Sequence, residues 1–91
     1  MYYVYILKNT KGDLYAGITE NVAERIRVHN SKKGARFTKN KPCFRLVFKE
    51  EYGSLSEARQ REIQIKKWRR DKKEFLIDKY SKRLETKPTN N

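Results

Sequence analysis

The chain has 91 residues, of which 23 are Lys or Arg and 11 are Asp or Glu, so its formal net charge at pH 7 is +12. This length allows one domain with a modest core, and the charge predicts an anionic partner, nucleic acid in preference to a membrane surface. A single cysteine excludes an internal disulfide, and the sequence lacks the long apolar run of a membrane-spanning helix. We expect a monomeric, cytoplasmic protein.

The first part of the chain predicts a β-hairpin. Residues 2–7 (YYVYIL) are apolar on both alternating faces, as in an interior strand, and residues 14–18 read as a second strand after turn-forming residues. A two-residue turn would send Tyr5 and Tyr15 to opposite faces, whereas a loop one residue longer or shorter would bring both to one face. Gly17, inside the second strand, indicates either a bulge or a close approach of backbone or ligand.

The middle of the chain predicts a helix, a basic loop and a third strand. A capping box at residues 21–24 begins a helix that continues to about residue 30. The loop at residues 31–41 carries four lysines, Arg36 and a single aromatic residue, Phe37. Residues 44–52 then alternate in polarity as a strand does.

The last part of the chain predicts two helices. A second capping box at residues 54–57 begins a helix that ends near residues 69–71, and residues 72–80 have the apolar spacing of another. The expected fold class is therefore α+β, a three-stranded mixed or antiparallel sheet flanked by about three helices in the order β-β-α-β-α-α. We expect a domain at residues 1–80 and a disordered polar tail at residues 81–91.

Glu62 interrupts the apolar face of the helix that begins near residue 55. At 100° per residue, Leu55, Ala58, Glu62 and Ile65 fall within an arc of roughly 80° that should face the core. Because an unpaired buried charge is very unfavourable, two explanations are open. Glu62 forms an ion pair with a cation such as Arg25 or His29 on the first helix, or it holds a divalent cation through oxygen.

Five motifs along the chain resemble those of a known family. In order they are YYVYIL at 2–7, LYAGIT at 14–19, ERIRVHN at 24–30, KGARFT at 33–38 and SEARQREIQIK at 56–66. Together they resemble the GIY-YIG nuclease domain, and more closely its small stand-alone bacterial branch; the chain is also similar to the amino-terminal nuclease domain of UvrC-type repair proteins. The resemblance spans roughly residues 1 to 80.

The resemblance implies a three-stranded sheet flanked by helices and an endonuclease site with one divalent cation, Mg²⁺ or Mn²⁺, held by Glu62. It implies catalytic roles for Tyr5, Tyr15, Arg25 and His29 as well, with Gly17 structural at the site. The two tyrosines lie near each other in the family, which selects the odd-numbered hairpin loop.

The resemblance also implies a division of roles. Arg25 would bind the phosphate, Tyr5 or alternatively Tyr15 would orient or deprotonate the attacking water, and His29 could share the proton transfer. One departure from some relatives is Ile18, which stands where they carry a lysine after the glycine.

The leading hypothesis is a divalent-metal-dependent endonuclease that hydrolyses DNA phosphodiester bonds with low sequence specificity, structure-selective in repair or recombination. The alternative is a non-catalytic module on the same fold that binds DNA or RNA. Targeting would depend on a partner protein that the sequence does not identify. Binding would rest on phosphate contacts that carry little sequence information. The side chains expected to bind nucleic acid are Lys32, Lys33, Arg36, Phe37, Lys39, Lys41, Arg59 and Lys66.

Overall fold

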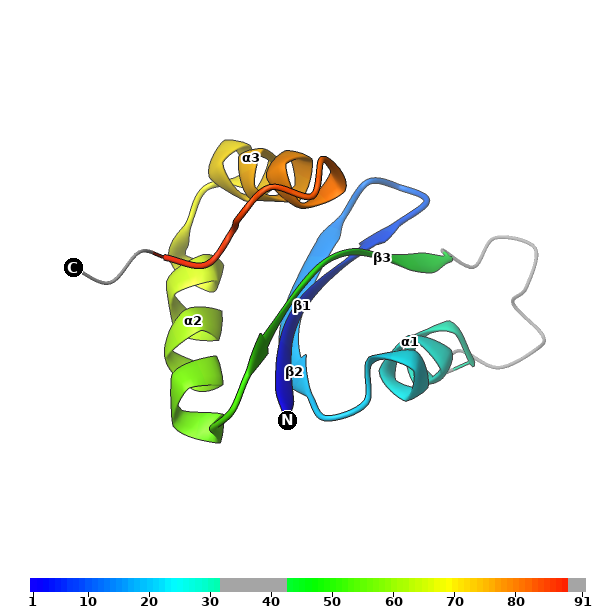
Figure 1. Ribbon diagram of the computed structural model, residues 1–91. Coiled ribbons are helices and arrows are strands. Elements are labelled where there is room, and N and C mark those ends of the chain that lie inside the picture. The colour runs from blue at the N-terminus through cyan, green and yellow to red at the C-terminus, as the bar shows by residue number, and fades with distance from the viewer. Residues whose placement is uncertain (32–42, 89–91) are drawn as a thin grey trace.

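The computed structural model describes residues 1–31 and 43–88 and has the predicted order of elements (Figure 1). The elements are β1 (Tyr2–Asn9), β2 (Leu14–Thr19), α1 (Val22–Ser31), β3 (Phe44–Tyr52), α2 (Leu55–Lys67) and α3 (Arg70–Ser81). The strands form one antiparallel sheet in the order β2-β1-β3, so β1 is central and β2 is an edge strand. The predicted α+β fold class is confirmed.

The helices cover both faces of the sheet. Figure 1 shows α1 on one side of the strands, with α2 and α3 on the other. Val4 and Ile6 point toward α2 and α3 and form a core cluster with buried apolar residues of β3 and those helices. Tyr5 and Leu7, which alternate with them, are also buried. Burial on both faces explains why the sequence of β1 is apolar throughout. The remaining members of the cluster are Phe48, Ala58, Ile65 and Leu76.

The β1–β2 hairpin has the odd-numbered loop. Tyr5 pairs with Gly17 and Leu7 pairs with Tyr15, so both tyrosines lie on one face of the sheet. The backbone N–H of Asn9 donates to the carbonyl of Asp13, and the turn between them contains Gly12 at φ +90°. A left-handed glycine at this position is typical of a three-residue hairpin loop.

Side-chain caps fix where two of the helices begin. The backbone N–H of Glu24 donates to the Asn21 side chain, at 3.0 Å, and that of Glu57 donates to the Ser54 hydroxyl, at 3.2 Å. Both residues were predicted as caps. Within the described residues, none of the helices has the length and hydropathy needed to cross a membrane.

Part of the expected polar tail lies against α2 and β3. Residues 82–88 are described, and the carbonyl oxygen of Thr86 accepts a hydrogen bond from Arg61 Nη2 at 2.8 Å. The Lys87 ammonium lies 4.5 Å from the centre of the Tyr52 ring. The prediction missed these contacts because they need no apolar side chain in the tail. Residues 89–91 lie outside the described residues.

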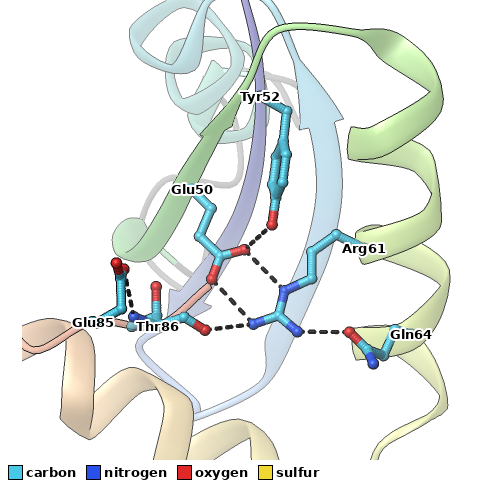
Figure 2. A network of polar contacts seen from close by, with 6 residues as sticks. All are labelled: Glu50, Tyr52, Arg61, Gln64, Glu85 and Thr86. Carbon is cyan, nitrogen blue, oxygen red and sulfur yellow. Dashed lines mark hydrogen bonds and ion pairs between the residues drawn. The ribbon is translucent and has the colours of Figure 1, made fainter. Parts of the chain in front are cut away.

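Arg61 and Glu50 form a buried ion pair that joins α2 to β3 (Figure 2). Arg61 Nε and Nη2 donate to the two carboxylate oxygens of Glu50, at 2.9 and 3.1 Å. The Tyr52 hydroxyl donates to Glu50 at 2.8 Å, and Arg61 Nη1 donates to Gln64 at 2.6 Å. Because both charges have several hydrogen-bond partners, the pair can be buried at little net cost.

Candidate active site

A cleft of about 760 Å³ opens over the edge strand β2, between α1 on one side of the sheet and α2 on the other. Every site residue expected from the sequence within the described ranges lines this cleft. Four elements contribute them, so only the folded chain brings them together. They are Tyr5, Tyr15, Gly17, Arg25, His29, Arg59, Glu62 and Lys66.

Tyr5 reaches the cleft because Gly17 has no side chain. A Cβ atom at Gly17 would lie 2.6 Å from the Tyr5 hydroxyl oxygen and 2.8 Å from Cζ, closer than real contacts allow. The glycine is therefore explained by close approach of an aromatic ring. Tyr5 is buried, whereas Tyr15 is 44% exposed at the mouth of the cleft.

Burial raises the pKa of the Tyr5 phenol above its ordinary value of 10.0. The charge of Glu62 acts in the same direction, while Arg25 opposes it through its charge and a hydrogen bond. The net direction is upward, so Tyr5 keeps its proton at neutral pH. A protonated phenol can donate a hydrogen bond to a phosphate or a water.

Helix α1 is attached to the sheet through Asn30, a residue that the sequence analysis did not single out. Its side-chain amide donates to the carbonyl of Phe44 at 3.2 Å, and its Oδ1 accepts from the Phe44 N–H at 2.7 Å. This two-way pairing sets the position of Arg25 and His29. The Phe44 ring also lies 5.3 Å from Tyr15 and 5.1 Å from His29, centre to centre, and so packs between two site residues.

Glu62 is 6% exposed and lies on the wall of the cleft. Arg59 Nη1 lies 3.2 Å from Oε1, and Lys66 Nζ lies 3.0 Å from Oε2. The prediction that Glu62 faces inward is correct, but these two partners come from its own helix. Both cations are more than half exposed, so either can turn toward solvent or a phosphate.

The donor set of the cleft fits a cation that keeps most of its water. Among residues 1–31 and 43–88, no cluster of three or more His, Cys, Asp or Glu side chains could hold a metal ion, which argues against zinc. Mg²⁺ needs only one or two carboxylates when water and a substrate phosphate complete its shell. Glu62, buried at the cleft wall with its two oxygens paired to the long side chains of Arg59 and Lys66, meets that requirement.

Residues 32–41 of the expected basic loop fall outside the described residues, whereas Ser31 ends α1. Among the expected nucleic-acid-binding residues within the described ranges, Arg59 and Lys66 add positive charge beside Arg25 at the cleft. The loop residues concerned are Lys32, Lys33, Arg36, Phe37, Lys39 and Lys41.

Known proteins share sequence with this chain. A family model described as the GIY-YIG catalytic domain matches residues 1–75. The UPF0213 protein SH2523 of Staphylococcus haemolyticus is 44% identical over 85% of this chain and 94% of its own length. A UPF0213 protein of Bacillus pumilus is 39% identical over 85% of the chain and 79% of its own.

A solved structure is also similar. The solution NMR structure of the UPF0213 protein BH0048 from Bacillus halodurans has a TM-score of 0.56 and 42% identity. The match covers 86% of this chain and 84% of that protein.

Proposed function

The chain belongs to the GIY-YIG family, and on that premise we propose that it is a divalent-metal-dependent endonuclease that hydrolyses phosphodiester bonds, with DNA as its substrate. One observation carries the proposal. Residues from β1, β2, α1 and α2 that match the family's motifs line a single cleft, with the carboxylate of Glu62 at its wall. A carboxylate repels phosphate, so Glu62 would add no affinity in a protein that only bound phosphates.

Each side chain has a task that its surroundings suit. Glu62 would hold Mg²⁺ or Mn²⁺, and a cation there supplies Lewis-acid polarisation of the phosphoryl oxygens. Arg25 neutralises the charge that develops on the phosphate. Tyr5 keeps its proton and orients the phosphate or the attacking water through its hydroxyl. His29 accepts the proton that the attacking water loses, since imidazole is a base suited to neutral pH.

Two surface cations, Arg59 and Lys66, neutralise the charge of the Glu62 carboxylate in the structure. On binding nucleic acid they would exchange Glu62 for phosphate oxygens, which frees the carboxylate for the cation. Substrate and metal would therefore bind more tightly together than singly.

The alternative is a nucleic-acid-binding module without useful turnover, on DNA or RNA. The same ion pairs favour it, because Glu62 already has two cations as partners. Ile18 also stands where some relatives have a lysine. Both functions predict binding, and only the first predicts cleavage.

The test compares the native chain with Glu62→Gln on supercoiled and branched DNA, with Mg²⁺, Mn²⁺ or a chelator. We expect metal-dependent nicking by the native chain and a loss of at least roughly 100-fold in rate for Glu62→Gln. Glu51→Gln is the matched control, since it removes an equal charge from an exposed site on β3. Binding of DNA without cleavage by any of the three proteins would establish the alternative.

A further inference from the structure

The junction of α2 and α3 carries a second hollow, of about 500 Å³, apart from the cleft. Its lining combines aromatic rings with cations and contains one acidic side chain. Such a mixture suits a ligand with both flat apolar faces and negative charge. The lining residues are Lys67, Trp68, Arg69, Asp71, Lys72 and Phe75.

Phe75 is the most exposed large hydrophobic residue of the described ranges, at 64%. It lies on α3, away from the core cluster. The Lys79 ammonium lies 5.8 Å from the centre of its ring, and that of Lys72 lies 4.5 Å from the Trp68 ring. A solvent-exposed phenyl ring with Lys79 beside it and Lys72 lining the same hollow offers a face on which a nucleobase could stack while the lysines contact the adjoining phosphates.

A hollow between β2 and α3 adjoins the cleft. This third hollow, of about 420 Å³, is lined by Asp13, Leu14, Tyr15, Arg70 and Lys73. Tyr15 also lines the cleft, and Arg70 and Lys73 lie on the first turns of α3. A strand leaving the cleft past Tyr15 would therefore meet Arg70 and Lys73, and the hollow at the α2–α3 junction begins at Arg69, the residue before Arg70.

We propose that α3 binds an unpaired strand that continues from the substrate in the cleft, with Phe75 as the platform for one base. Paired bases are stacked on their neighbours and do not offer a free face, so the ring selects a single-stranded segment. This inference rests on the proposed function and names its substrate class. The preferred substrate is a nucleic acid in which single strand adjoins the site of cleavage.

The test measures binding in the presence of chelator, so that cleavage plays no part. Two labelled DNA hairpins are compared by fluorescence anisotropy, one blunt and one with an unpaired tail of about ten nucleotides. The native chain should bind the tailed hairpin roughly tenfold more tightly, and Phe75→Ala should reduce that ratio to about one. Phe75→Trp should keep the preference because it keeps a stacking face. Leu84→Ala, which shortens another apolar side chain that is 54% exposed, should also keep it.

The outcomes separate this inference from the function on which it rests. If the native chain and Phe75→Ala both bind the two hairpins, and the ratio of their affinities is the same in both proteins, the α3 site is overturned and the proposed function stands. Loss of preference in Phe75→Trp as well would overturn the stacking argument. If the native chain binds neither hairpin, the proposed function fails together with the α3 site.

Discussion

At the scale of single residues, Gly17 and Tyr5 show how one missing side chain shapes the cleft. Glycine in an edge strand weakens the strand, yet here it lets the Tyr5 hydroxyl lie across β2 toward Arg25 and Glu62. If residue 17 had a side chain, the Tyr5 ring would have to leave its buried position. The two residues therefore act as a pair.

We expect Gly17→Ala to destabilise the fold by about 1–3 kcal/mol, the usual range for overpacking. The added methyl group would meet the Tyr5 ring at less than 3.0 Å, and the ring has little room because Tyr5 is buried. Urea denaturation of the native chain and the variant measures the difference.

Tyr5→Ala supplies the control for this pair. With the ring removed, Gly17→Ala should cost almost nothing, so a double-mutant cycle should return an interaction energy close to the full cost. An unchanged cost in the Tyr5→Ala background would mean that the methyl group is opposed by some other contact.

At the scale of elements, two adjacent positions of α2 carry opposite charges, and the two side chains face different surroundings. Glu62 faces the cleft, and Arg61, one residue earlier, reaches Glu50 on β3. The Arg61 contacts fix the rotation of α2 about its axis, and that rotation points Glu62 into the cleft. Figure 2 shows Arg61 joined by hydrogen bonds both to Glu50 and to Thr86 in the chain after α3.

Arg61→Met should lower the free energy of unfolding by about 3–5 kcal/mol, because it leaves the Glu50 carboxylate buried without its cation. Lys82→Met removes a cation from an exposed pair with Asp78, and should cost less than about 1 kcal/mol. Thermal and urea denaturation measure both variants.

Adding Glu50→Gln to Arg61→Met tests the reason for that cost. The neutral amide needs no cation and can still accept from the Tyr52 hydroxyl, so the double variant should be more stable than Arg61→Met alone. If it is less stable, loss of packing and not the unpaired charge explains the effect.

The elements were predictable because their apolar spacing is regular, and the same regularity contained signals that were missed. Glu50 lies two residues after Phe48 and two before Tyr52, on the inward face of β3, and Arg61 lies four residues before the buried Ile65. Opposite charges at two inward positions predict a buried ion pair. The sequence analysis noted only the charge at Glu62.

Other features depend on contacts that the sequence does not specify. The hairpin register was open until the family resemblance favoured one loop, since turn residues at 9–13 suit several lengths. Asn30 binds Phe44 through backbone groups that every residue possesses, so nothing in the composition indicates the pairing. The ring of Phe44 likewise reaches Tyr15 and His29 only because α1 is held there.

At the scale of the whole molecule, the chain after α3 returns to the sheet and completes the Arg61 network. Thr86 contributes its carbonyl oxygen, and Lys87 covers the Tyr52 ring. This segment thus touches both β3 and α2, two elements that enclose the core. Composition reports side chains, whereas the principal contact of this segment is made by its backbone.

Removal of residues 85–91 should therefore lower the free energy of unfolding by about 2–2.5 kcal/mol, because it removes both the hydrogen bond to the charged Arg61 and the contact of Lys87 with the Tyr52 ring. Arg61 would keep Glu50 and Gln64 as partners, and for that reason the loss should be smaller than in Arg61→Met. Thr86→Ala keeps the carbonyl group and should change stability little, whereas Lys87→Gln should remove only the cation–π part, about 0.5–1 kcal/mol. Denaturation curves for the three variants measure each contribution. If the truncated chain were as stable as the native one, water would replace the Thr86 carbonyl at Arg61 without loss of stability. Residues 85–91 would then contribute nothing to the free energy of unfolding.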